Sequence, residues 1–416
     1  MSEITLNILV EASSPGGGNC LTSVTELEPA AGPHASVAPA KYASPIPNDR
    51  NGAYAYERRY LGGVSQPAVL VDSKQSQLNR VEAALQLAIE QGHPTLSRLP
   101  RIEVRYERDG VTETYSDLTL PHRGFDGHIR AGTSGGEPVT RTDEYRAIRN
   151  ATAGNARGLL DASPASLIFG SWDSTRATRQ GRWRSALVGE IIGFCEEGDR
   201  AEARRGGARE ARRGGARVDP VGMQIRLTPS ELTALAEAQS ADLSAATMKK
   251  VMTAANKAKS GEQLSASMLV LGGIPPTLDA LSGVACHRII RSHVLSFATL
   301  RQIRFGGDVK ADVACRALLA ALALNGLARS DAELYLRANC DLREKSVSVV
   351  EIDRRGGSRV PLSALSVAAA DALLDAALQH AERAASVRWN GVVLEVDGNP
   401  AIVAGAVAED AEETVS

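Results

Sequence analysis

The segment that most constrains the fold is residues 311–328, a nearly continuous run of small and apolar side chains dominated by Ala and Leu. Because a helix formed by this run is apolar on almost every side, the run predicts a helix buried in a core. Hydrophobic residues make up 43% of the 416 positions, which is enough for a sizeable core. The run is shorter than the roughly 20 residues that a membrane helix needs, and we expect no membrane-spanning segment.

Strands and helices are mixed along the rest of the chain. A compact apolar strand at 68–71 precedes Asp72 and Ser73, which can cap a helix over 78–89. The ranges 101–106 and 111–115 flank an Asp-Gly pair and predict a β-hairpin. Other expected elements are strands at 167–169, 223–227, 347–352 and 388–396, helices at 183–194 and 362–385, and two Ala-rich helices after residue 227. The elements do not follow a strict strand–helix repeat, so the sequence predicts an α+β fold.

Three parts are expected along the chain. Residues 1–67 are rich in Gly, Pro, Ser and Ala from residue 11 onward and predict a loop-rich N-terminal segment, whereas 68–394 form the folded body. Residues 395–416 are an acidic C-terminal tail. Within the body, GluAlaArgArgGlyGlyAlaArg occurs twice, over 202–217, and predicts a mobile Arg/Gly loop at 199–217. A nonspecific nucleic-acid contact and a neutral insertion explain this loop equally well.

Charge is distributed unevenly although the net charge is only −2. Residues 1–40 carry −4 and residues 395–416 carry −6, which leaves +8 for the segment between them. A basic body suits a polyanionic partner, since bound cations release counterions from a nucleic acid. The acidic tail has the simpler explanation of a solvated end that aids solubility. Five scattered Cys and a start without a basic leader predict a cytoplasmic protein.

The stretch Leu167 to Ser174, LeuIlePheGlySerTrpAspSer, gives the first functional signal. We expect Gly170 to turn the chain after a short strand, so that Trp172 leaves the sheet edge. Arginines follow at positions 176, 179, 182 and 184, together with Trp183. An aromatic face among guanidinium groups is a surface for stacking bases and holding phosphates. The simpler alternative is a strand end capped by Asp173 with a half-buried Trp.

The start of the helix after Ser73 gives a second signal, because backbone N–H groups there favour anions. Its polar residues include Lys74, Gln75, Asn79 and Arg80. Catalytic motifs are missing, since the sequence has no GxxxxGK[ST], GxGxxG after a strand, GxSxG or HExxH. His122, Asp126 and His128 form one cluster that could ligate a metal or supply a general acid, or could be ordinary loop residues. We predict no enzyme activity, no cofactor and no metal.

Several segments in order resemble the backbone subunit of type I-G (formerly I-U) CRISPR Cascade complexes, the Cas-seven-type branch of the RAMP superfamily. They are LeuValAspSerLysGlnSerGlnLeuAsnArg (70–80), HisArg with Asp at 122–126, SerProAlaSerLeuIlePheGlySerTrpAspSer (163–174), ArgSerAlaLeuValGlyGluIleIleGly (184–193), GlyGlyIleProPro (272–276) and LeuSerPheAlaThrLeuArg (295–301). The resemblance implies a hand-shaped, RRM-like (ferredoxin-like) palm over 68–394 with finger and thumb insertions, the thumb hairpin lying at about 101–140.

The same resemblance implies a non-catalytic subunit that polymerises along crRNA and presents it for pairing with target DNA. Its partners would be further copies of itself, a large subunit, a Cas-five/Cas-six-type subunit and a recruited helicase–nuclease. The expected RNA contacts are Lys74, Gln75, Asn79, Arg80, His122, Arg123, Arg130, Trp172, Arg182, Arg184, Lys249 and Lys250. Two alternatives are a metal-dependent ribonuclease of the type III-like backbone kind that uses Asp126, and a single-stranded RNA-binding protein that does not polymerise.

Overall fold

The computed structural model of the chain describes residues 2–42, 53–108, 110–173, 175, 181–196, 219–222, 224–273 and 283–406. The chain divides into two compact units. The first unit comprises Met1–Ala40, Tyr54–Asp199 and Gly283–Val403, and the second comprises Lys41–Ala53, Arg200–Ser282 and Ala404–Ser416.

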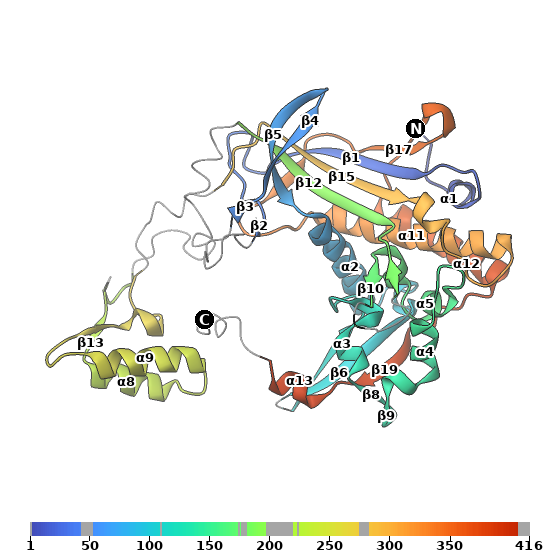
Figure 1. Ribbon diagram of the computed structural model, residues 1–416. Helices are drawn as coiled ribbons and strands as arrows, with labels where there is room; N and C mark the ends of the chain where they lie inside the picture. The colour runs from blue at the N-terminus through green and yellow to red at the C-terminus, as the bar shows by residue number, and fades with distance from the viewer. Residues whose placement is uncertain are drawn as a thin grey trace. The chain divides into compact units, whose positions relative to one another are not determined.

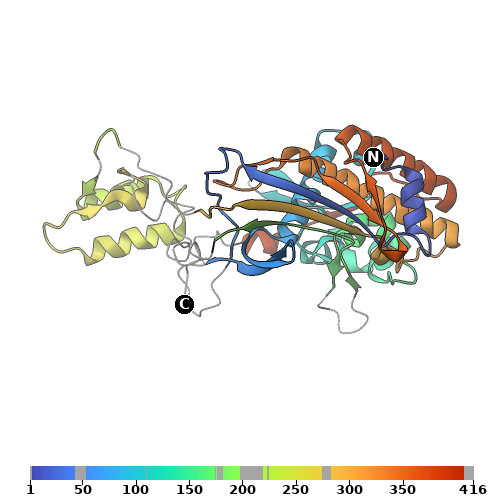
Figure 2. The same cartoon turned by 90° about the horizontal axis from the view of Figure 1, so that it is seen from above.

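An antiparallel sheet of eight strands forms the first unit's main layer, in the order β18-β17-β1-β15-β12-β5-β4 with β16 paired to β1. The strands are β1 (Cys20–Pro29), β4 (Tyr56–Leu61), β5 (Val64–Asp72), β12 (Leu187–Phe194), β15 (Arg288–Ser296), β16 (Leu342–Glu344), β17 (Val349–Asp353) and β18 (Arg359–Leu362). Along β15 every second residue is buried, which is the period expected of a strand with one face on the core. Figure 2 shows these strands side by side across the unit.

Helices α2 (Lys74–Glu90), α11 (Val309–Glu333) and α12 (Val367–Ala385) pack beneath this sheet (Figure 1), and α1 (Leu6–Ser13) packs against α11 beside the end of the sheet. Helix α11 is buried from Ala311 to Leu327, as its Ala/Leu sequence predicts. Gly326 permits its close approach to α2, because a Cβ there would lie 2.7 Å from Val81 Cγ1. Among the described helices, α11 alone has the length and hydropathy of a membrane span, but 94% of its apolar window is buried, as in the core helix of a soluble protein.

A second sheet in the first unit has the order β7-β6-β19-β8-β9. Its strands are β6 (Arg101–Arg108), β7 (Val111–Ser116), β8 (Thr133–Ser134), β9 (Glu137–Pro138) and β19 (Val392–Asp397), with β6 and β19 parallel. Short helices lie among and after its first strands in the chain: η2 (Arg123–Phe125) and α3 (Gly127–Arg130) between β7 and β8, then η3 (Val139–Arg141), α4 (Asp143–Arg149), α5 (Arg157–Ala162) and α6 (Pro164–Ile168) after β9. A two-stranded hairpin, β10 (Ser171–Trp172) with β11 (Arg182–Trp183), lies between α6 and β12 in the sequence.

The second unit contains helices α8 (Pro229–Ala238) and α9 (Ala245–Lys257), strands β13 (Arg226–Leu227) and β14 (Leu264–Ser265), and η5 (Ala266–Leu269). Leu232, Ala236, Val251, Ala266 and Leu269 form its buried core. The remaining described elements are β2 (Lys41–Tyr42), β3 (Ala53–Tyr54), η1 (Leu96–Arg98), α10 (Phe297–Leu300), η7 (Arg355–Gly357) and α13 (Pro400–Ala404).

The α+β prediction is confirmed, as are the 101–115 hairpin, the two Ala-rich helices and the strand after residue 347. The loop prediction for residues 11–67 is wrong, because β1 lies inside the main sheet and β4 is its edge strand. The helix expected at 183–194 is strand β12, and the strand expected at 167–169 is the end of helix α6. Glu395 and Asp397 of the expected acidic tail belong to β19. The Arg/Gly loop at 199–217 lies outside the described residues.

Candidate nucleic-acid interface

A hairpin presents Trp172 at the surface of the first unit. Helix α6 ends at Ile168, and Gly170 then turns the chain with φ +82°. A Cβ on Gly170 would lie 2.9 Å from both the Trp183 carbonyl oxygen and the Ser185 nitrogen, so the turn requires glycine. Trp172 pairs with Arg182 across the two strands. The prediction that Trp172 leaves the core is confirmed, since 48% of it is exposed.

Arg182 stacks on this exposed indole. Its guanidinium carbon lies 4.2 Å from the centroid of the Trp172 ring. At an exposed site such a cation–π contact stabilises by about 0.5–1 kcal/mol, enough to orient two long side chains but little compared with burial. The pair therefore presents a flat aromatic surface and a positive charge together.

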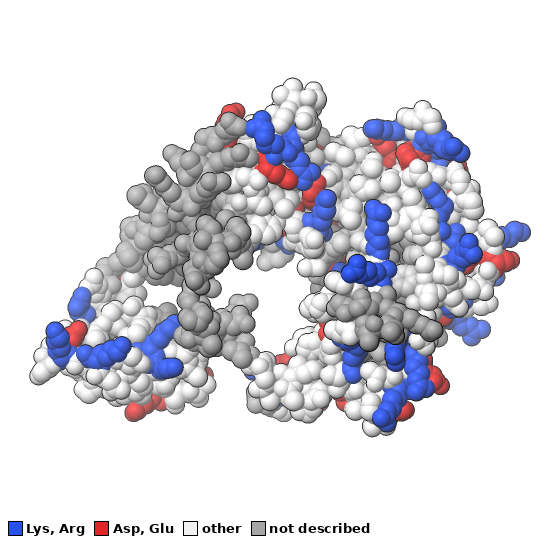
Figure 3. Space-filling view, in the orientation of Figure 1, with Lys and Arg blue, Asp and Glu red and all other residues white. Residues whose placement is uncertain are grey.

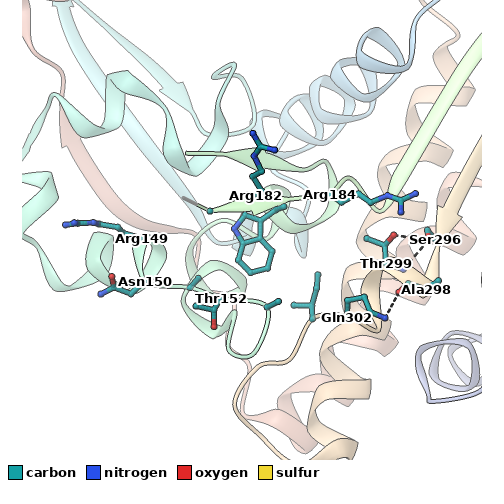
Figure 4. Close-up of a pocket in the computed structure, with 14 residues that line it drawn as sticks. Arg149, Asn150, Thr152, Arg182, Arg184, Ser296, Ala298, Thr299 and Gln302 are labelled. Carbon is teal, nitrogen blue, oxygen red and sulfur yellow. Dashed lines mark hydrogen bonds between the residues drawn. The ribbon is translucent and has the colours of Figure 1, made fainter. Parts of the chain in front are cut away.

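A cavity of about 980 Å³ lies beside β11 (Figure 4), between the end of α4 and helix α10. Three arginines line it, Arg149, Arg182 and Arg184, and no Asp or Glu occurs among its described lining residues. Its polar, uncharged lining includes Asn150, Thr152, Ser296, Thr299 and Gln302. Cations without carboxylates attract phosphate, and amide and hydroxyl groups can hydrogen-bond the edges of bases.

The α10 wall of this cavity is ordered by its own hydrogen bonds. The Ser296 hydroxyl oxygen accepts hydrogen bonds from the Thr299 backbone N–H at 3.1 Å and the Thr299 hydroxyl at 3.0 Å, which caps the helix. On the opposite wall, Trp183 is half-buried, and its indole Nε1 is buried without a hydrogen-bond partner among the described residues. The indole N–H is thus one donor at this wall that the protein itself leaves unused.

Buried ion pairs hold the base of the hairpin. Arg123 donates to both carboxylate oxygens of Glu82 at 2.5 and 2.7 Å, and to the carbonyl oxygen of Gly170 at 2.8 Å. Burial raises the pKa of Glu82 above its usual range, although Arg123 opposes that shift. Arg130 contacts Asp173, which is buried just after Trp172, at 3.3 Å. The structure therefore places Arg123 largely inside the protein and the partly exposed Arg130 against a buried carboxylate, and both position the hairpin.

The start of α2 separates into exposed and engaged residues. Ser73 caps the helix by accepting the Ser76 N–H; Gln75 and Asn79 are exposed, and so is Lys74, whose Nζ lies 4.0 Å from Glu190 Oε2. Arg80 is less free to contact a ligand than these exposed residues, because it donates to both carboxylate oxygens of buried Asp72 at 3.1 and 3.2 Å.

Asp72 is the common acceptor at this point of the first unit. Gln77 and Arg337 also donate to its carboxylate. Burial raises the pKa of Asp72, but the hydrogen bonds from Arg80 and Gln77 outweigh burial and hold that pKa below its usual range. The ionised carboxylate therefore needs Arg80 as a partner inside the fold, which limits that arginine as a phosphate ligand.

The 122–128 cluster consists of capping groups. One Asp126 carboxylate oxygen accepts the His122 backbone N–H and the other accepts the His128 backbone N–H, both at 2.9 Å. His128 Nδ1 lies 2.8 Å from the Tyr106 hydroxyl, and the His122 residue is exposed. Across the described part of the chain, no three His, Cys, Asp or Glu side chains are placed to share a metal ion. This arrangement matches ordinary turn chemistry.

Lys249 and Lys250 are exposed on α9 in the second unit. Within the first unit, the structure brings Trp172, Arg182 and Arg184 together and adds lining residues that sequence reasoning missed: Arg149, Asn150, Thr152, Thr299 and Gln302. The only sequence signal for any of them was the segment 295–301, which contains Thr299. Arg176 and Arg179 lie outside the described residues.

Residues 21–196 match the model of a family described as CRISPR-associated protein GSU0053. The matched range runs from β1 to β12 and contains α2, the capping cluster and the Trp172 hairpin. No curated protein matches the chain. This part of the chain is therefore similar to a CRISPR-associated protein, which confirms the CRISPR association that the sequence resemblance implies.

Proposed function

We propose that this protein is a guide-RNA-binding backbone subunit of a CRISPR effector complex, of the Cas-seven type found in type I-G Cascade. The observation that carries the proposal is the exposed Trp172–Arg182 stack beside a cavity lined by arginines and free of described acids. The Trp172–Arg182 stack and the cavity wall formed by β11 lie within the range that matches a CRISPR-associated family, which supports the same interpretation. Stacking and phosphate contact together are how proteins hold single-stranded RNA.

In this proposal the main sheet with its helices is the RRM-like palm of the RAMP superfamily. Copies polymerise along crRNA in the cytoplasm and leave its bases free to pair with target DNA, so base pairing supplies the sequence specificity. The large subunit, a Cas-five/Cas-six-type subunit and a helicase–nuclease complete the assembly. The subunit itself performs no catalysis.

Binding of a labelled single-stranded RNA, followed by fluorescence anisotropy, tests the proposal. Stacking on a base is worth about 1–3 kcal/mol, so Trp172→Ala should weaken binding by about 5- to 150-fold. Because Trp172 is half exposed, the melting temperature of the Trp172→Ala variant should stay close to that of the parent protein. Tyr60→Ala is the matched control, since Tyr60 is 78% exposed in β4. Equal affinity of the parent protein and Trp172→Ala would refute the assignment.

Two further measurements separate the alternatives. Light scattering with and without guide-length RNA distinguishes a filament from a single-stranded RNA-binding protein that does not polymerise. Incubation with complementary RNA and Mg²⁺ tests the ribonuclease that would use Asp126, whose two oxygens accept backbone hydrogen bonds. RNA cleavage that Asp126→Asn abolishes would replace our proposal with that enzyme.

A further inference from the structure

Helix α9 carries a basic face that is separate from the Trp172 hairpin. At 100° per residue, Lys249, Lys250, Thr253, Asn256 and Lys257 fall within an arc of about 120°, and all five are exposed. Val251 on the opposite side is fully buried in the core of the second unit, with Met248 packed against that core. The acidic residues of the helix pair are on α8, and α9 contains no Asp or Glu.

The lysines of this face are exposed, and their pairing can be followed through the described residues. Lys249, Lys250 and Lys257 form no ion pair with any residue that the structure describes. Several basic side chains of the first unit behave differently, as Arg59 pairs with Glu190 and Lys345 pairs with Glu26. Uncompensated like charges on one helix face repel one another, and a bound polyanion removes that repulsion. In Figure 3, Lys and Arg side chains are visible on the surface of this unit.

The composition around α9 decides which polyanion fits. Residues 200–282 contain no Phe, Trp, Tyr or His. Proteins that hold single strands use aromatic side chains as platforms for the unpaired bases, and this segment offers none. A duplex keeps its bases stacked inside and presents its phosphates, which need only lysine and small polar donors such as Thr253 and Asn256. From Lys249 to Lys257 the helix rises about 12 Å, comparable to the width of the major groove of B-DNA.

We propose that the exposed face of α9, Lys249, Lys250, Thr253, Asn256 and Lys257, is a second nucleic-acid site that grips the phosphates of double-stranded DNA independently of sequence. The first unit then holds a single strand by stacking, and the second unit holds a duplex by charge. The inference stands on the charge and composition around α9 and does not require the Trp172 site to exist.

The test uses the full chain with a labelled 25-base-pair DNA duplex, a duplex RNA of equal length and a single-stranded RNA. The variant is Lys249→Ala/Lys250→Ala/Lys257→Ala, in which alanine keeps a high helix propensity. Each lost duplex phosphate contact lowers the log–log salt slope by about 0.9, so the slope for duplex DNA should fall by about 2 to 3. Arg343→Ala/Lys345→Ala/Arg359→Ala is the matched control, because it removes three charges that are paired in the first unit.

The expected result is weaker duplex DNA binding with a smaller salt slope in the α9 variant, together with unchanged single-stranded RNA binding. Trp172→Ala should show the reverse pattern, so failure of one site does not conceal the other. Duplex binding that is unchanged in the α9 variant, or equally weakened in the control, overturns the inference. So does an equal loss of single-stranded RNA binding, which would make α9 part of the single-strand site. Tight binding of duplex RNA but not duplex DNA would also overturn it.

Discussion

Arginine 123 provides the sharpest test of how the hairpin is held. Its side chain is 14% exposed and that of Glu82 is 4% exposed, so this ion pair is largely shielded from water. Arg123→Ala would leave the Glu82 carboxylate buried without its cation and the Gly170 carbonyl without its donor. Removing one partner of a buried pair costs about 3–5 kcal/mol, because the remaining charge keeps its desolvation penalty. We therefore expect Arg123→Ala to lower the free energy of unfolding of the first unit by about that amount.

Urea unfolding followed by tryptophan fluorescence is suited to this measurement, since Trp172, Trp183 and Trp389 all belong to the first unit. Glu82→Gln/Arg123→Ala should recover part of the loss, because no buried charge remains. Arg146→Ala is the matched control, as its pair with Asp143 is exposed and should contribute under about 0.5 kcal/mol. A free energy for Arg123→Ala within 1 kcal/mol of the parent protein, or no recovery in the double variant, would refute the reasoning.

Two more perturbations follow from the same region. Burial raises the pKa of Asp117 to about 7, so the folded state retains a proton that the unfolded chain releases near pH 4. The free energy of unfolding should therefore fall as pH rises from about 4 to about 7, by up to about 4 kcal/mol. Asp117→Asn should reduce this fall, as measured by urea midpoints at pH 5 and pH 8. Gly170→Ala should destabilise the hairpin by about 1–3 kcal/mol and weaken RNA binding, because the new Cβ would clash with the backbone of Trp183 and Ser185 and because the residue has a positive φ. Unchanged RNA affinity in fluorescence anisotropy would contradict this.

Local periodicity predicted much of the fold. The buried helix α11, the Ser73-capped helix α2 and the hairpin at the Asp-Gly turn all have signals confined to one short segment. Strand β1 was not predicted, because its alternation of buried and less buried residues is flanked by Gly- and Pro-rich sequence. Strand β12 was predicted as a helix, because Trp183, Leu187, Ile191 and Phe194 also fit a helical spacing. Only its pairing with β15 and β5 decides between a helix and a strand. Such pairing joins residues about a hundred positions apart, which no local pattern reports.

The candidate site was predicted in part for a related reason. Exposure of Trp172 follows from Gly170 and the polar residues around it, and all of that information is local. The cavity beside it is assembled from α4, β11 and α10, and α10 follows β11 by more than a hundred residues. The lining residues Asn150 and Gln302 therefore carry no signal in the sequence around them.

Some arginines of the first unit pair with buried carboxylates and stabilise the fold, whereas others are exposed beside the cavity. Amino-acid composition cannot separate these two kinds of arginine. Arg80, Arg123 and Arg130 were all expected to contact RNA, yet each contacts a buried carboxylate: Asp72, Glu82 and Asp173. Arg182 and Arg184 have exposed side chains beside the cavity. If the hairpin binds RNA as proposed, we expect substitution of Arg123 or Arg130 to lower RNA affinity by loosening the hairpin, and substitution of Arg184 to lower it by removing a phosphate contact. Only the second kind of change reduces the salt slope while leaving the unfolding transition in place, so the two measurements must be made on the same variants.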